Sequence, residues 1–413
     1  MTSSRRVLAA LCGLASTAAI AVPSVAAGAS PSDTIRATPS DSQARGTSAS
    51  FLKLWTPEWM ARRSTPYSSA ELQAMAARFH VIAAMPNKFK STAASMRAVN
   101  PDLKLVVYKN ATFGNGTRFP EDLYARNASG GKVAAKDWPT TFVMQLTDAR
   151  WRTEVADKCV LLTRTSNYDG CFLDVLGPGP LVAPAYLLSK PVNADGSVWT
   201  PNQWVSAATR IAGAVDDAMS GTVMGNGLGY GPRYFDPTQQ TRPLVSELDG
   251  AMAEVFVRGP QDSVTRFRSE EHWRAEVDML IDVEAQGKAA MTVTKVWTPA
   301  TPAQVNQWHR YTVATFMLGT NGKSMMCFLR DKSTTSTMMD HPYNRVNLGT
   351  ATGRYQKVGA TYQRGYSGGL AVVNPTSSPV TVPLTGSFRT MDGATVTGSI
   401  VIPAHDGQAL VRS

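Results

Sequence analysis

The sequence predicts an α/β protein, a (β/α)8 TIM barrel followed by a small C-terminal antiparallel β-sandwich domain. From residue 51 onward, short apolar runs alternate with amphipathic stretches, which is typical of repeated βα units. Eight such units follow one another, and eight is the number that closes this kind of barrel. Beyond residue 340 only short strand-like runs remain, separated by turn residues, which indicates a small β domain.

The chain begins with an export signal. Arg5 and Arg6 precede an apolar run over residues 7–22, and small residues then provide a cleavage site, so we expect residues 1–29 to be removed. Both the general and the twin-arginine export routes remain open. Residues 30–50 are rich in Ser, Thr, Ala and Pro and form a disordered linker. The mature protein is therefore expected to be secreted.

Charge and hydropathy limit the kinds of partner. The formal net charge is +10, but Lys and Arg are scattered and not interleaved with aromatic residues, so no nucleic-acid partner is expected. The excess positive charge suits a surface that associates with an anionic cell wall. No later run is long and apolar enough for a membrane helix, so no membrane anchor is expected. The sequence carries no signature of an oligomeric state.

The barrel domain is expected over residues 51–340, preceded by the linker and followed by the β domain over 341–413. Its strands are expected at 51–55, 80–85, 103–108, 171–173, 223–227, 250–253, 289–296 and 324–329. Helices are expected at 88–99, 151–163, 201–219, 269–286 and 302–318, and one more begins after Ser68, with Glu71 in its first turn. A long glycine-containing insertion follows the third strand, and the run 142–146 ends it. An open doubly wound sheet is the alternative, but no glycine-rich phosphate turn follows the first strand.

The C-terminal domain is predicted from four short apolar runs. They lie at 370–373, 380–382, 388–391 and 399–402 and are separated by Asn374-Pro375, Asp392-Gly393 and Asp406-Gly407. We expect this domain to pack on the barrel, and a sugar-binding role for it is the less favoured alternative.

Three cysteines remain after cleavage. Cys159 and Cys171 are close in sequence and would form a disulfide in an exported protein, whereas Cys171 and Cys327 equally suit buried free thiols in strands. None of the three has the paired spacing of a zinc site, and no cluster of His and carboxylate residues predicts a metal or another cofactor.

Two carboxylates end apolar strands. Asp174 follows the fourth strand and Glu254 follows the sixth, and each strand is preceded by an Asp-Gly pair. In a β/α barrel, residues at the carboxyl ends of the strands face the active site, so this repeated pattern makes both carboxylates catalytic candidates. Asp169 and Asp249, in the two Asp-Gly pairs, lie at the opposite ends and are expected to be turn or positioning residues. The simpler alternative is that Asp174 caps the following loop.

Other polar and aromatic residues are expected near the same ends of the strands. The candidates for substrate binding are Trp55, Tyr108, Lys109, Asn226, Arg258, Lys295 and Trp297. Each has a simpler reading: the tryptophans suit packing at the barrel rim, and Asn226 between glycines suits a left-handed turn. Lys295 and Arg258 would equally pair with the carboxylates without touching substrate.

Glycoside hydrolysis fits this set best. It requires two carboxyl groups, one ionised as nucleophile and one protonated as general acid, and aromatic side chains bind the flat faces of sugar rings. The sequence does not indicate a Ser-His-Asp hydrolase, because no Gly-x-Ser-x-Gly turn joins an expected strand to an expected helix to carry the nucleophile. A barrel that binds carbohydrate without cleaving it is the alternative, since the same aromatic residues would serve it.

These motifs carry a family resemblance. The segments YDGCFLD, GNGLG, DGAMAEVF and YTVATFMLGTNGKSMMCF resemble the exported bacterial families described as hypothetical glycosyl hydrolases, whose (β/α)8 barrels are related in outline to those of α-galactosidases and polygalactosaminidases. TDARWRTEVADKCVLL resembles the segment that leads into the Asp-bearing strand, and GGLAVVNPTSSPVTVPL resembles the β domain that ends many glycosidase barrels.

The resemblance covers nearly everything from residue 51 onward. It implies that Asp174 is the nucleophile and Glu254 the acid/base. From the two carboxylates on convergent strand ends we expect an exported retaining glycosidase that acts on a polysaccharide or oligosaccharide. The long insertion after the third strand departs from the family pattern, so the sugar and the linkage do not transfer.

Overall fold

The computed structural model describes residues 52–61, 65–183, 186–331 and 341–413. The predicted export signal and linker, which together cover residues 1–50, lie outside these ranges. Within them, no helix is both long and apolar enough to span a membrane.

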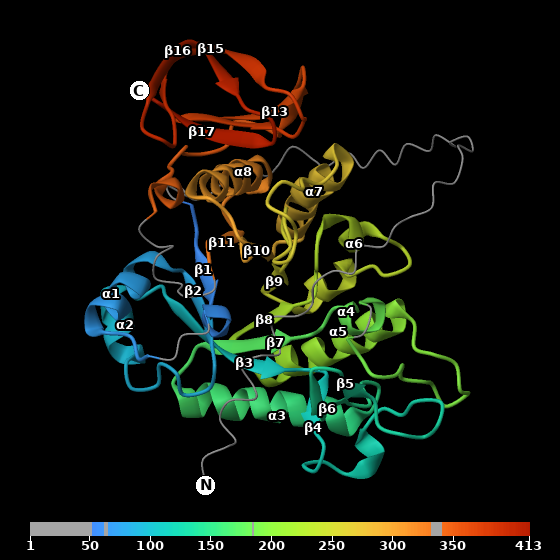
Figure 1. The fold of residues 1–413 in the computed structure, drawn as a ribbon. Coiled ribbons are helices and arrows are strands. Elements are labelled where there is room, and N and C mark those ends of the chain that lie inside the picture. The colour runs from blue at the N-terminus through green and yellow to red at the C-terminus, as the bar shows by residue number, and fades with distance from the viewer. Residues whose placement is uncertain (1–51, 62–64, 184–185, 332–340) are drawn as a thin grey trace, which may run out of the picture.

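Eight parallel strands form the barrel, and their order in the sheet follows their order in the chain (Figure 1). They are β1 (Trp55–Pro57), β2 (Val81–Ala84), β3 (Lys104–Asn110), β7 (Gly170–Asp174), β8 (Thr222–Asn226), β9 (Gly250–Ala253), β10 (Ala289–Lys295) and β11 (Met325–Leu329). A parallel bridge between Leu54 and Met326 joins the first strand to the last. The predicted barrel is therefore confirmed.

Helices surround the strands, and their first turns are set by local sequence. The longer ones are α1 (Ser69–Arg78), α2 (Ala93–Val99), α3 (Ala149–Ser166), α5 (Pro201–Ala218), α7 (Glu270–Ala285) and α8 (Pro302–Gly319), and the short ones are α4 (Gly179–Val182) and α6 (Gly231–Phe235). Single 3₁₀ turns are η2 (Glu58–Ala61), η3 (Glu121–Leu123), η4 (Arg242–Glu247) and η5 (Pro342–Arg345). Ser68, Thr200 and Thr301 each form a capping box with the residue three positions on, which fixes the starts of α1, α5 and α8.

Strand alternation divides the barrel core in two. On β3, Val106 and Tyr108 face the barrel interior, whereas Leu105 and Val107 face the helices. Because parallel strands are covered on both faces, they are apolar along most of their length. This is why the strands could be found as short apolar runs.

The insertion after β3 forms its own small sheet. Strands β4 (Phe113–Asn115), β6 (Trp138–Val143) and β5 (Ala134–Ala135) are antiparallel, with β6 in the middle. The run 142–146, expected to be apolar and extended, contributes only its first two residues to β6.

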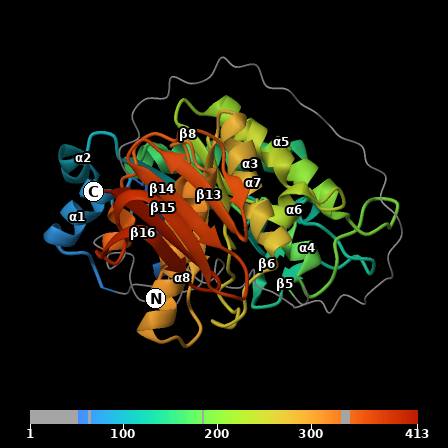
Figure 2. The same ribbon diagram turned by 90° about the horizontal axis from the view of Figure 1, so that it is seen from above.

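The C-terminal domain is one six-stranded antiparallel sheet that folds over on itself. Its strands are β12 (Gln356–Val358), β13 (Thr361–Tyr366), β14 (Gly369–Asn374), β15 (Val380–Arg389), β16 (Thr395–Ile402) and β17 (Asp406–Arg412). Val372 and Leu410 on one layer pack against Val382 and Ile402 on the other, so the predicted β-sandwich is confirmed. Figure 2 shows the domain lying over α8, where Arg310 pairs with Asp406 at 2.6 Å.

Three sequence-based boundaries were wrong. The first strand, expected over 51–55, is Trp55–Pro57, and residues 52–54 precede it. Residues 88–92 form turns, not the start of α2, because Asn87 is left-handed and the N–H of Phe89 is bound by the Tyr168 hydroxyl. Asp406-Gly407, expected to be a turn, begins β17, where the Asp406 carboxylate is held by Arg310.

Candidate active site

Asp174 is the last residue of β7, and three donors among the described residues hold its buried carboxylate. The Tyr108 hydroxyl donates to Oδ2 at 2.7 Å, and the N–H of Val175 and the side chain of Asn226 donate to Oδ1 at 2.9 and 3.0 Å. An ionised carboxylate only accepts hydrogen bonds, so this arrangement suits the charged form. The donors come from two neighbouring strands and from the following residue, which fixes the side chain in place.

The backbone directly after Asp174 is strained. Val175 has a φ of 65°, a left-handed conformation that β-branched residues rarely adopt. Such strain costs on the order of 1–3 kcal/mol and persists where the surrounding structure enforces it. Here the conformation brings the Val175 N–H to the carboxylate, and the N–H of Leu176 then donates to the Asn226 carbonyl at 2.8 Å.

Glu254 directly follows β9, two barrel strands from Asp174. Its side chain is buried, and Oε1 accepts from Lys295 Nζ at 2.7 Å while Oε2 accepts from Asn226 Nδ2 at 2.8 Å. Lys295, at the end of β10, is also buried, so the charges of this ion pair are shielded from water. Asp174 thus accepts from a hydroxyl and Glu254 from a cation, and the two carboxylates share one amide.

Asn226, at the end of β8, lies between the two carboxylates and donates to both. Because its Nδ2 lies 3.0 Å from the Asp174 oxygen and 2.8 Å from the Glu254 oxygen, those two oxygens are separated by at most the sum of the distances, about 5.8 Å. Carboxyl groups of retaining glycosidases lie about 5–5.5 Å apart, whereas inverting enzymes need about 6.5–9.5 Å. The bound applies to one pair of oxygens, and it is compatible with the retaining spacing.

The Asp-Gly pairs at the opposite ends of the same strands have a structural role. Oδ2 of Asp169 accepts the N–H of Leu105 at 2.8 Å, and Oδ2 of Asp249 accepts the N–H of Val223 at 3.0 Å. Each carboxylate therefore joins the start of its strand to the preceding strand. Gly170 is required here, because a Cβ would lie 2.0 Å from the Thr222 carbonyl oxygen.

Trp297 provides an aromatic surface beside the pair of carboxylates. It is partly exposed, its ring lies 5.1 Å from Lys295 Nζ, and its Nε1 donates to the Asp331 carbonyl at 3.1 Å. A partly exposed ring that is held at one edge suits stacking against a sugar.

The family of the chain follows from a match over most of the barrel. The family model of hypothetical glycosyl hydrolase family 15 matches residues 97–370, which include every residue of the site described above. The chain belongs to this family. Membership of this family makes it a glycoside hydrolase. The resemblance to the hypothetical glycosyl hydrolases, noted from the sequence, is confirmed. No curated protein gives a significant sequence match.

Solved structures share the fold of this family 15 chain at low identity. A maltogenic α-amylase from Thermotoga neapolitana has a TM-score of 0.50 at 10% identity, with 88% of this chain and 99% of that chain covered. A pullulanase from Anoxybacillus sp. LM18-11 has a TM-score of 0.50 at 9% identity, with 91% and 71% covered. At such identities the likeness shows the barrel architecture alone.

Two tryptophans of the family 15 chain pack inside the barrel. Trp55 is fully buried, stacks on Phe172 at 6.1 Å and donates to the Thr292 carbonyl, so it fills the barrel core and does not face the site opening. Trp59, which the sequence did not single out, packs on the Tyr108 ring at 4.8 Å. Its position four residues after Trp55, past the end of the first strand, was the signal that could have found it.

The structure does not bring Lys109 and Arg258 to the carboxylates. Lys109 follows Tyr108 on β3 and so faces outward, where its amine donates to the Asn110 carbonyl at 2.6 Å and lies 5.2 Å from the Trp151 ring. Arg258 is buried in the loop after β9, where it donates to the carbonyls of Gly259, Asp262 and Lys295. Arg258 therefore ties this loop to the end of β10.

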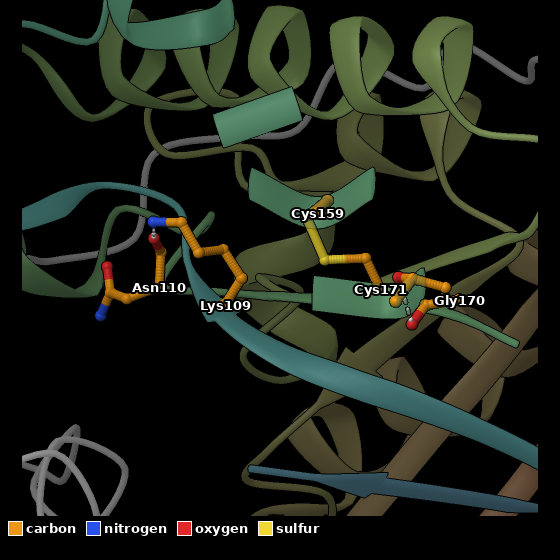
Figure 3. The surroundings of a disulfide bond; sticks show 6 residues. Lys109, Asn110, Cys159, Gly170 and Cys171 are labelled. Carbon is orange, nitrogen blue, oxygen red and sulfur yellow. Dashed lines mark hydrogen bonds between the residues drawn. A yellow bond between two sulfur atoms is a disulfide. The ribbon is translucent and has the colours of Figure 1, made fainter. Parts of the chain in front are cut away.

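A disulfide fastens α3 to the strand that carries Asp174. Cys159 and Cys171 are bonded, with Cα atoms 5.7 Å apart, as Figure 3 shows. This settles the alternatives that the sequence left open, and Cys327 is the buried free thiol of the described chain. Burial raises the pKa of the Cys327 thiol, which keeps it protonated and unreactive at neutral pH.

Proposed function

We propose that this chain is a secreted retaining glycoside hydrolase that cleaves O-glycosidic bonds in a polysaccharide or oligosaccharide. In this proposal Asp174 is the nucleophile and Glu254 is the acid/base. The observation that carries it is the single amide nitrogen of Asn226, which binds one oxygen of each carboxylate and so keeps those two oxygens within about 5.8 Å of each other.

The proposed reaction has two steps. Asp174 attacks the anomeric carbon while the glycosidic C–O bond breaks, and Glu254 gives its proton to the leaving oxygen. Glu254 then takes a proton from water, the water oxygen attacks the anomeric carbon, and the ester to Asp174 breaks. Oε2 of Glu254 is the oxygen that would exchange the proton, because Oε1 is bound to Lys295.

One observation favours the reverse assignment of roles. The ammonium group of Lys295 stabilises a negative charge on Glu254, and a carboxylate that stays ionised suits a nucleophile. We retain Asp174 as the nucleophile because its three donors likewise suit the charged form, and because it lies on the strand that the family resemblance assigns to that role.

Two observations support secretion. The first is the charged, apolar and small-residue segment at residues 1–29. The second is the Cys159–Cys171 disulfide, since disulfides persist in oxidising compartments and are rare in the cytosol. Fractionation of the native host, with detection of the mature N-terminus, tests this part of the proposal.

Release of reducing sugar from a broad panel of polysaccharides and oligosaccharides tests the activity. Wild type should cleave at least one of them, and Asp174→Asn should lose cleavage while its far-ultraviolet circular dichroism stays unchanged. The matched control is Asp157→Asn, an exposed position on α3, which should retain activity. Binding of glycans without cleavage by wild type would show instead a barrel that only binds carbohydrate.

Chemical rescue assigns the two roles. With an activated aryl glycoside and azide, the nucleophile variant Asp174→Ala should yield a glycosyl azide of inverted configuration, whereas Glu254→Ala should yield one of retained configuration. If the two outcomes are exchanged, Glu254 is the nucleophile and the assignment is reversed.

A further inference from the structure

A cavity outside the barrel lies behind the strand that carries Tyr108. It has a volume of about 250 Å³ and is bounded by the loop after β2, the end of β3, the insertion and α3. Since a water molecule takes up about 30 Å³ in the liquid, this space suits a small molecule and not a polysaccharide chain.

The walls of the cavity are mostly apolar. Phe113 and Phe119 of the insertion, Trp151 and Leu162 of α3, and Met85 after β2 line it. Phe119 meets Trp151 edge to face at 5.2 Å, so the aromatic wall is well packed. Ligand sites commonly combine such walls with a few polar groups that fix orientation.

The charged groups at this cavity are mainly cations. Lys109, Arg118 and Lys158 all line it, and Glu154 is the one carboxylate among the lining residues. Within the described chain, the structure gives neither Arg118 nor Lys158 an ion-pair partner, and Lys109 uses one of its three N–H donors on the Asn110 carbonyl. Figure 3 shows this contact at the end of β3.

From the cations, the apolar walls and the volume, we propose that this cavity is a second binding site, which takes a small organic carboxylate with an apolar body. The carboxylate would lie at Arg118 and Lys158, near the lysine amine, and the body would lie between Phe113 and Trp151. An aromatic or aliphatic acid has this chemistry. A neutral sugar does not, because its hydroxyls would lie against apolar walls.

The site is separate from the carboxylates of the barrel but shares β3 with them. Lys109 faces outward to the cavity, whereas the preceding residue, Tyr108, sends its hydroxyl to Asp174. The inference does not rest on the proposed hydrolysis, because it uses none of the catalytic groups.

Binding should depend on the charge of Lys109. Burial lowers the pKa of its amine from 10.5 to about 8, with Arg118 and Lys158 acting in the same direction and Glu154 opposing them. The amine carries its charge below that pKa, so affinity for a carboxylate should fall as the pH rises above 8.

Isothermal titration of the mature protein with 3-phenylpropionate tests the site. Saturable binding is expected, and the neutral analogue 3-phenylpropan-1-ol should bind about tenfold more weakly, since hydrogen bonds to charged groups are the stronger ones. Glucuronate, a carboxylate with a polar body, should also bind more weakly. No binding of 3-phenylpropionate, equal binding of the alcohol, or tighter binding of glucuronate would each overturn the proposal.

Variants locate the site. Lys158→Met should weaken binding several-fold, and Leu162→Trp should abolish it by filling the cavity without a change in charge. The matched control is Lys104→Met, an exposed lysine at the other end of β3, which should bind like wild type. Asp174→Asn should also bind like wild type, so a failure of the proposed hydrolysis leaves this test intact. Unchanged binding by Leu162→Trp, with its fold retained, would place the ligand elsewhere and overturn the assignment.

Discussion

The amine of Lys295 lies 2.7 Å from Oε1 of Glu254, and both side chains are buried at the carboxyl ends of neighbouring barrel strands. Water cannot solvate either charge well in this position, so each side chain depends on the other. The ion pair therefore fixes the orientation of Glu254, and Oε2 remains available to accept the hydrogen bond from Asn226.

Lys295→Met should destabilise the protein by about 3–5 kcal/mol, because it leaves the Glu254 carboxylate buried without its cation. Urea unfolding measures this loss. The double variant Lys295→Met/Glu254→Gln should recover most of it, since no uncompensated charge remains. A double variant that is as unstable as Lys295→Met would contradict the role of the ion pair.

Asn226→Ala should lower kcat/KM about 100-fold, because it removes the amide that holds both carboxylates. Asn226→Asp should lower it further, since a third carboxylate would repel the other two. The measurement is kcat/KM on the substrate found by screening. Asn202→Ala, at the exposed start of α5, is the control. Equal activity of Asn226→Asp and wild type would show that the amide does not position the pair.

Cys159→Ser/Cys171→Ala should destabilise the protein by about 3 kcal/mol, the loop-closure effect for a disulfide that spans 12 residues. Reduction of wild type by dithiothreitol should lower its unfolding midpoint in the same way. Cys327→Ala is the control, because this thiol takes part in no disulfide, so reduction should still affect that variant. If reduction leaves the midpoint of wild type unchanged, the bond does not contribute to stability.

Glu276 should make the folded state less stable as pH rises. It is buried in α7 and accepts the N–H of Gly231 at 2.9 Å, and burial raises its pKa from 4.5 to about 8. Between these values the folded state holds a proton that the unfolded state has lost, so its contribution to stability is full below pH 4.5 and is lost as pH rises through 8. Each pH unit of that window removes up to about 1.4 kcal/mol.

Unfolding of wild type and Glu276→Gln at pH 5 and pH 8 checks this dependence. From pH 5 to pH 8, the free energy of unfolding should fall less for Glu276→Gln than for wild type. His272, the neighbouring group, stays neutral in this range because burial lowers its pKa to about 4. Glu271→Gln, exposed on the same helix, should behave like wild type. The same pH dependence in Glu276→Gln and wild type would rule out Glu276 as its source.

The barrel could be predicted from sequence because its signals are local. Parallel strands covered on both faces are continuous apolar runs, and helix starts such as Ser68 carry their caps in the sequence. The start of the second helix was predicted wrongly because tertiary contacts set it. The N–H of Phe89 donates to the Tyr168 hydroxyl, which lies 79 residues along the chain.

The candidate site was only partly predictable, for two physical reasons. Neighbouring residues of a strand point to opposite sides, so Tyr108 and Lys109 could not both face the barrel interior. Their position at the carboxyl end of the strand did not by itself show which of the two does. Arg258 lies in a loop, past the end of β9, where no periodicity fixes the direction of a side chain. Asn226 binds both carboxylates because of the distances between neighbouring strands, and these distances cannot be read from the spacing of residues in the sequence.

The configuration of the first product distinguishes a retaining from an inverting enzyme. Proton NMR of a fresh digest of the screened substrate, recorded before mutarotation, shows the anomer that the enzyme releases. We expect the product to keep the anomeric configuration of the substrate, because the two carboxylate oxygens that Asn226 binds lie within about 5.8 Å of each other, which suits the retaining mechanism proposed above. Release of the opposite anomer would contradict it.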